Sequence, residues 1–403
     1  MSDLKSEQIL YFRDSYITEW KTEIESSQHD EEGTWYTFKQ TIFYPEGGGQ
    51  NSDRGFINGI ALKQVKSING EIWHLLESTI DNPVVMKLDW ESRYANMQQH
   101  TGQHILSACF KKRHNLETVS VHLGSEITMI ELNTPGISQE VLDATELMAN
   151  QIIRDQMPVS SVWTDREHLS EFDIRRRVKS SAEDIRLIRI GDLDCVGCGG
   201  THVRSTAEVG LIKILGVEKI RNHIRVKTKI GKSAVDYFSL LHQNLQKISN
   251  LFTTSIEDLP EKINTLLAEK KELAGRIKKI NELWLTEYAK NLDEVDFPGC
   301  FYVKDLNKDH LKNLSANWLS LHHRPCLFIS QEENRTNFYL RYPQNFNLNA
   351  QDFIQAHSDR FGLKGGGGKD FAVGEITVEN VDKDDLWDFF RIFCQHADYR
   401  GEK

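Results

Sequence analysis

The sequence has no apolar run of the length that a membrane-spanning helix needs, which argues against a helical membrane protein. Its start, MSDLKSEQILYF, has no basic stretch followed by an apolar one, so no secretory signal peptide is predicted. Cysteine is scarce: six residues stand irregularly in 403, a pattern that fits a reducing compartment better than a disulfide framework. These absences predict a cytoplasmic protein without membrane contact.

An excess of positive charge is also missing, since 49 Lys and Arg stand against 59 Asp and Glu and give a net charge of −10. This balance argues weakly against nucleic acid as a partner. The stretch from Arg175 to Lys232, however, is strongly basic, which is typical of a surface that binds a polyanion. A solvated surface without a ligand is the alternative. The residues predicted here to contact nucleic acid are Arg175, Arg176, Arg177, Lys179, Lys213 and Arg221.

Two pairs of metal-ligand side chains lie about ninety residues apart, His100 with His104 and Cys198 with His202. Histidines four positions apart share one face of a helix, and the Cys-Gly-Gly-Thr-His segment is a turn that can fold toward the same centre. Imidazoles and a thiolate together suit Zn²⁺. The sequence leaves open whether the shell is closed and structural or open and catalytic. A redox pair of Cys195 and Cys198 is a further alternative, which leaves His202 unexplained.

Two glycine-rich segments are candidate ligand loops. In the first, Gly47, Gly48 and Gly49 precede Gln50, and either a sharp turn or a loop that contacts nucleic acid through Gly48, Gly49 and Gln50 fits. The second, Gly365–Gly368 followed by Lys369, is not a P-loop, because Asp370 stands where Ser or Thr is required. A phosphate-binding nest with Lys369 as counter-charge and a flexible surface loop both remain open.

The pattern along the chain predicts an α+β protein with four parts. Residues 1–90 are mostly β-strand, and we expect a β-barrel-like domain there. Residues 91–233 form an α/β domain with the metal ligands, and 234–290 form a helical arm with coiled-coil spacing that Lys270 interrupts. Residues 291–403 form a separate α/β domain.

HTGQHILS and CGGTHV resemble the editing domain of alanyl-tRNA synthetases and of its free-standing relatives. FYPEGGGQNSDRG resembles the glycine-rich stretch of the preceding domain, and GGGGKDFAVG is similar to the DHH-associated domain at the synthetase C-terminus. The motifs cover nearly the whole chain in the family's order and leave no room for an aminoacylation domain. The chain therefore resembles the long form of the free-standing alanyl-tRNA editing proteins.

This resemblance implies an enzyme that hydrolyses the ester of tRNA(Ala) mischarged with serine or glycine, and so protects translation fidelity. It implies Zn²⁺ held by His100, His104, Cys198 and His202, with the first two counted also as catalytic. Thr201 and His122 are the expected substrate contacts, although the synthetases commonly have glutamine at the position of His122.

A homodimer through the arm or the C-terminal domain is also expected. The alternative function is a non-catalytic tRNA-binding protein with a structural zinc. A DHH phosphoesterase is disfavoured, because the sequence contains no Asp-His-His.

Overall fold

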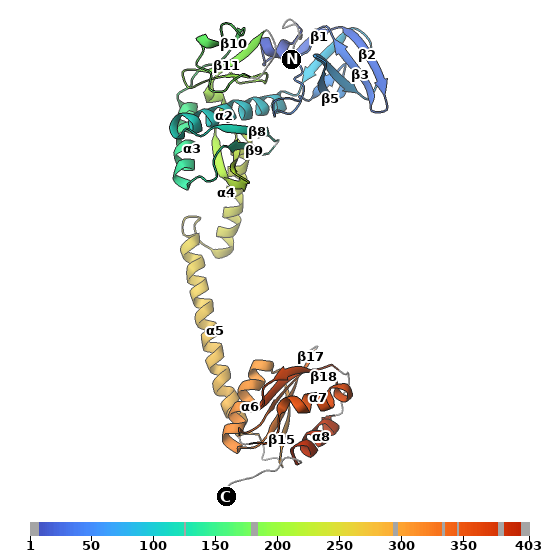
Figure 1. Ribbon diagram of the computed structural model, residues 1–403, viewed down its shortest axis with the longest axis vertical. Coiled ribbons are helices and arrows are strands. Elements are labelled where there is room, and N and C mark those ends of the chain that lie inside the picture. The colour runs from blue at the N-terminus through green and yellow to red at the C-terminus, as the bar shows by residue number, and fades with distance from the viewer. Residues whose placement is uncertain are drawn as a thin grey trace. The chain divides into compact units, whose positions relative to one another are not determined.

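The computed structural model describes residues 8–124, 126–178, 184–292, 297–332, 335–344, 346–377 and 383–395 (Figure 1). The chain divides into two compact units, Met1–Leu251 and Phe252–Lys403. Each unit combines helices with β-sheets, which confirms the α+β class. The finer division into four domains stays a prediction. Among the described helices, none has the length and apolar character that crossing a bilayer requires.

A seven-stranded sheet makes up the first part of the N-terminal unit, in the order β1-β7-β4-β5-β6-β3-β2. After a short helix α1 (Leu10–Arg13), its strands are β1 (Glu19–Thr22), β2 (Ile24–Asp30), β3 (Gly33–Phe38), β4 (Gly55–Ile57), β5 (Ile60–Ile68), β6 (Glu71–Leu76) and β7 (Val84–Leu88). In β7, alternate residues Val84, Met86 and Leu88 are buried, as a half-buried strand requires.

The predicted β-barrel-like closure is wrong for the described strands of this sheet. β1 and β2 are its two edges, and they follow each other in the chain with Glu23 alone between them. The chain thus connects the two edges covalently, but no ladder of backbone hydrogen bonds joins β1 to β2 in the described residues. The sheet is open, and the glycine-rich loop follows β3.

The rest of the N-terminal unit surrounds helix α2 (Trp90–His114), which packs against β8 and β9 (Figure 1). Asp89 begins the helix by accepting a hydrogen bond from the backbone of Ser92, and Asn115, in the left-handed conformation, ends it. Every residue from Met97 to Phe110 is buried. Polar ligand side chains on this helix are therefore placed in the interior.

Two further sheets flank α2, in the orders β13-β14-β9-β8 and β10-β11-β12. The remaining elements of this region are β8 (Thr118–Leu123), β9 (Thr128–Leu132), α3 (Gln139–Arg154), β10 (Val159–Thr164), the 3₁₀ turn η1 (Leu169–Glu171), β11 (Ile185–Ile190), β12 (Asp194–Gly197), the 3₁₀ turn η2 (Thr206–Val209), β13 (Ile212–Ile220) and β14 (His223–Ile230). Their apolar side chains form one core with Met97, Ile105 and Phe110 of α2.

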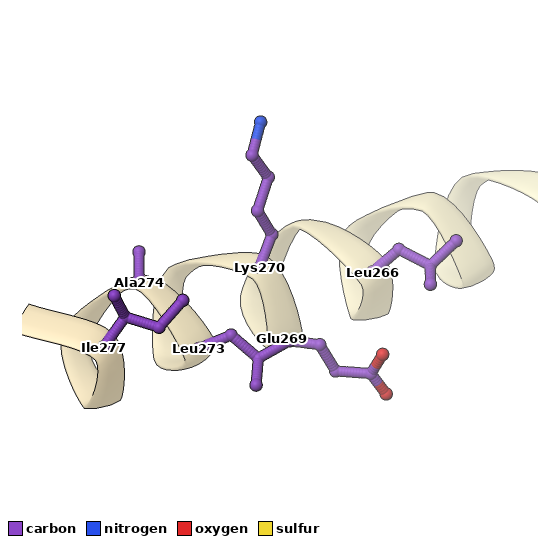
Figure 2. A pocket seen from close by; sticks show the side chains of 6 residues that line it. All are labelled: Leu266, Glu269, Lys270, Leu273, Ala274 and Ile277. Carbon is purple, nitrogen blue, oxygen red and sulfur yellow. The ribbon is translucent and has the colours of Figure 1, made fainter. Parts of the chain in front are cut away.

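Two long helices occupy the region of the predicted arm. α4 (Lys232–Phe252) belongs to the N-terminal unit almost entirely, and α5 (Leu259–Lys290) belongs to the C-terminal unit. On α5 most of the apolar residues at coiled-coil spacing are exposed, and six side chains line an open pocket on the surface of this one helix (Figure 2). These are Leu266, Glu269, Lys270, Leu273, Ala274 and Ile277.

The C-terminal unit contains a five-stranded sheet in the order β15-β16-β17-β19-β18. Its elements after α5 are β15 (Gly299–Lys304), α6 (Lys308–His322), β16 (Cys326–Glu332), β17 (Arg335–Arg341), α7 (Ala350–Phe361), β18 (Leu363–Gly367), β19 (Phe371–Ile376) and α8 (Lys383–Gln395).

The glycine run before Lys369 is neither a phosphate nest nor a flexible loop, because Gly365–Gly367 lie within strand β18. A Cβ atom at Gly365 or Gly367 would collide with the backbone of β19, so close strand packing explains glycine at these two positions. Lys369 is exposed in the turn that follows.

His74 of β6 makes the stability of the N-terminal sheet sensitive to acid. Its ring is fully buried between the Thr41 hydroxyl, 2.8 Å from Nε2, and the Tyr36 carbonyl, 3.2 Å from Nδ1. Burial lowers the pKa of His74 from 6.5 to about 4. The unfolded chain therefore binds this proton near pH 6.5, whereas the folded chain binds it only near pH 4.

We expect the contribution of His74 to be complete above about pH 6.5 and to be lost as pH falls toward 4, by about 3 kcal/mol in the free energy of unfolding. Denaturant unfolding of the wild type and of His74→Gln from pH 7 to pH 4 measures this. The stability difference between the two proteins should change in favour of the variant by about that amount. A difference that does not change with pH would contradict the assignment.

Candidate metal centre

The structure brings together the four side chains predicted as metal ligands. The ligand atoms of His100, His104, Cys198 and His202 all lie within 4.8 Å of one another. His100 and His104 come from the buried part of α2, one turn apart, and Cys198 and His202 come from the turn after β12. The three rings surround one point, with centroids 4.4 to 5.0 Å apart.

The distances within the cluster fit a single metal ion. Cys198 Sγ lies 3.3 Å from His100 Nε2 and 3.4 Å from His202 Nε2. A tetrahedral ion with zinc bond lengths separates a nitrogen and a sulfur ligand by about 3.5 Å. The side chains therefore already have nearly the spacing that one ion would impose, which makes this a candidate metal centre.

The protonation of these groups also favours metal binding. Burial lowers the pKa of His100 to about 3 and that of His104 to about 4, and it lowers the pKa of His202 well below its ordinary value. Burial raises the pKa of Cys198, but the hydrogen bond with His104, the Gly200 N–H and the charge of Arg186 outweigh it, so the net shift is downward. Neutral imidazoles and a thiolate are the forms that bind metal.

The Nδ1 side of the His104 ring faces a buried carboxylate. Its Nδ1 lies 3.8 Å from an Asp194 carboxylate oxygen, and Asp194 accepts two hydrogen bonds from Arg175, at 2.6 and 3.1 Å. Carboxylates commonly orient metal-bound histidines through a hydrogen bond, but at this distance His104 Nδ1 has no hydrogen-bond partner among the described residues. Arg175 was predicted to contact nucleic acid, but its guanidinium is instead engaged with this buried carboxylate. Sequence reasoning missed Asp194, for which the linear spacing offers no signal.

Arg186 of β11 stabilises the turn that carries Cys198 and His202. This buried arginine donates hydrogen bonds to the carbonyls of Cys198 and Gly200, at 3.0 and 2.8 Å. His202 Nδ1 lies 3.1 Å from the Thr101 hydroxyl on α2. The sequence gave no indication of these contacts, because Arg186 was counted only as part of the basic segment.

Gln50 is buried next to the four-residue cluster. Its side chain is 1% exposed and is hydrogen-bonded to His100 and to Thr201, so it differs from the predicted contact with nucleic acid. Thr201, predicted to contact the substrate, is fully buried between the two turn ligands. Gly48 and Gly49 are exposed, with φ of +59° and +86°. They form the turn that leads to Gln50.

Comparisons with known proteins show the family of this chain. The profile of the threonyl and alanyl tRNA synthetase second additional domain matches residues 185–225, which include Cys198 and His202. Alanyl-tRNA editing protein AlaX-L of Pyrococcus horikoshii is 31% identical over 92% of this chain and 95% of its own length. The chain belongs to the alanyl-tRNA editing protein family.

Two other relatives are similar to different lengths of this chain. Alanyl-tRNA editing protein Aarsd1-A of Xenopus laevis is 32% identical over 65% of this chain and 68% of its own length. The alanine–tRNA ligase of Pyrococcus abyssi is 29% identical over 93% of this chain but only 42% of its own length. The likeness thus extends to free-standing editing proteins and to a synthetase.

The basic segment of the editing protein is largely paired with carboxylates. Lys213 contacts Glu146 at 2.7 Å, and Arg225 contacts Glu131 at 2.6 Å. Arg176, Arg177 and Arg221 are exposed and form no ion pair with the described residues. Lys179 lies outside the residues that the structure describes.

His122, the other predicted substrate contact, is at the exposed end of β8. Its ring is exposed, and its backbone lies beside Gly49. The structure therefore places it next to the glycine turn that carries Gln50, on the outer side of that turn.

Cys198 and Cys195 offer a matched test of the centre, because they lie three residues apart and only Cys198 belongs to the four-residue cluster. Loss of a group that hydrogen-bonds to a metal ligand commonly weakens metal binding roughly 10- to 100-fold. We expect Cys198→Ala, which removes a ligand itself, to weaken it by more than that. Cys195→Ala should leave affinity unchanged. Co²⁺ titration, read from the thiolate-to-cobalt absorption, measures both; an equal loss in the two variants would contradict the assignment.

Proposed function

We propose that this editing protein hydrolyses the ester bond of tRNA(Ala) mischarged with serine or glycine, with Zn²⁺ held by His100, His104, Cys198 and His202. The convergence of these four side chains at metal-ligand distances is the observation that carries the proposal. The 31% identity with AlaX-L over nearly the whole chain supports the substrate class.

The chemistry needs a polarised carbonyl, a positioned water and a held 3′ end. When bound, Zn²⁺ supplies Lewis acidity or a more acidic water at this point. We propose that Thr201 contacts the substrate: its Oγ1 accepts a hydrogen bond from Gln50, so its own proton can be donated to a substrate oxygen.

Selectivity for serine over alanine follows from polar groups that pair with the seryl hydroxyl. With alanine these groups would remain buried and unpaired, which is unfavourable. Thr201 is our candidate for this contact, and His122 is a candidate for the amine or for the adjacent backbone of the tRNA end.

Exposed cations and the glycine turn are proposed to hold the tRNA. Arg176, Arg177 and Arg221 are available for phosphate contacts, and Gly48 and Gly49 let a backbone approach closely. Lys213 and Lys369 remain candidates, the first in competition with Glu146. The affinity for tRNA should then fall as salt rises.

Deacylation tests the proposal directly. We expect wild-type protein to release serine or glycine from mischarged tRNA(Ala), to spare Ala-tRNA(Ala), and to lose activity with a chelator. His104→Ala should lose bound zinc and lower kcat/KM on the order of 100-fold or more. His114→Ala, on the same helix but outside the cluster, is the control. Full activity in zinc-free His104→Ala would refute the catalytic centre, and zinc and tRNA binding without single-turnover hydrolysis would favour the non-catalytic alternative.

We also propose a homodimer through the exposed apolar face of α5. Leu273, Ile277 and Ile280 are each more than half exposed, at positions that repeat with coiled-coil spacing. Sedimentation analysis should give a dimer for the wild type and a monomer for Ile277→Glu. Lys278→Glu changes charge at the neighbouring position and should remain dimeric. A wild-type monomer at all concentrations would exclude this contact.

A further inference from the structure

We propose that Gln50 is a positioning residue that joins the two ligand-bearing segments and sets the metal affinity of the centre. The inference rests on the proposed metal binding, and it assigns to Gln50, at the end of the glycine turn, a task other than contact with nucleic acid. Gln50 is not itself a ligand. It acts through His100 on α2 and through Thr201 in the turn between Cys198 and His202.

Three hydrogen bonds connect the Gln50 amide to both segments. Its Oε1 lies 2.7 Å from His100 Nδ1 and 3.2 Å from the Thr201 backbone nitrogen, and its Nε2 lies 2.9 Å from the Thr201 hydroxyl. The Thr201 N–H can only donate, so the amide oxygen must be the atom that faces it. This fixes the orientation of the amide.

The same oxygen determines the tautomer of His100. Because Oε1 only accepts, the proton of the neutral imidazole must be on Nδ1. Nε2 then carries the lone pair, and it is the atom that lies 3.3 Å from Cys198 Sγ. Gln50 thereby presents His100 in its metal-binding form before an ion arrives.

Gly200 shows how closely the three parts pack. A Cβ atom at this position would collide with the His100 ring and would lie 2.9 Å from Gln50 Oε1. The turn backbone, the imidazole and the amide therefore pack closely together.

The loop that carries Gln50 is anchored on the helix of His100. Gly47 and Gln50 exchange backbone hydrogen bonds of 2.9 and 3.1 Å, and the Gly49 carbonyl accepts from Leu123 at 3.0 Å. Three residues further, Asp53 forms a fully buried ion pair with Arg93, two turns before His100 on α2. These contacts hold the loop in place and so position the Gln50 amide.

The experiment compares three substitutions in the full chain. Gln50→Leu keeps the size but removes all three hydrogen bonds, whereas Gln50→Glu keeps an acceptor for His100 and Thr201. Gln98→Leu is the matched control: Gln98 is a buried amide on α2 whose partners are the backbones of Glu208 and Lys232, at 2.8 and 3.1 Å. Zinc dissociation constants come from competition with a chromophoric chelator, and Co²⁺ spectra report the coordination geometry.

We expect Gln50→Leu to bind zinc about 10- to 100-fold more weakly and to change the Co²⁺ spectrum. Gln50→Glu should stay close to wild type, and Gln98→Leu should bind zinc normally. Wild-type affinity in Gln50→Leu would overturn the proposal, and so would an equal loss in Gln50→Leu and Gln98→Leu. If only the proposed function is wrong, zinc binding would still depend on Gln50 in this way, but the wild type would hydrolyse no ester.

A second measurement does not depend on the variants folding. In metal-free wild-type protein, the long-range ¹H–¹⁵N spectrum should show His100 protonated at Nδ1. A ring protonated at Nε2 would overturn the proposal.

Discussion

The burial of three imidazoles and a cysteine sulfur around one point is the constraint on which the N-terminal unit depends. A buried polar atom without a partner costs about 1–3 kcal/mol, so each ring nitrogen directed away from the cluster needs a neighbour. Nδ1 of His100 has Gln50 and Nδ1 of His202 has Thr101, whereas Nδ1 of His104 has no hydrogen-bond partner among the described residues and lies 3.8 Å from an Asp194 carboxylate oxygen. These three neighbours come from three separate segments of the chain, so the centre requires the packing of all of them.

The buried pair of Arg93 and Asp53 extends this constraint into the sheet. Its guanidinium also donates to the carbonyls of Ser15 and Ile42, at 2.8 and 2.7 Å. Loss of one partner of a buried pair commonly costs about 3–5 kcal/mol, because the other charge stays buried. A single arginine in the first turn of α2 therefore couples loops that flank the open sheet to the helix that carries His100 and His104.

Local pattern was enough to predict which four side chains converge and where the long helices lie, because the spacing of His100 and His104 is a property of one helix. The partners of those ligands could not be read in the same way. Gln50 and Asp194 reach the cluster from other segments, and nothing in the sequence near either residue records that contact. Closure of the first sheet failed as a prediction for a related reason: strand patterns show which residues form strands but not whether β1 pairs with β2.

The basic segment shows how a charge count and a surface differ. Fourteen basic residues between 175 and 232 suggested a continuous cationic stripe, yet Arg175 and Arg186 are committed to the metal centre and Lys213 and Arg225 to carboxylates. A cation that already pairs with a carboxylate gains less from a phosphate, because the existing partner must be displaced. With a net charge of −10 on the whole chain, non-specific attraction to RNA is weak. Recognition of a tRNA by this protein must then depend on a few placed cations and on the shape of the site, which favours selectivity over strength of binding.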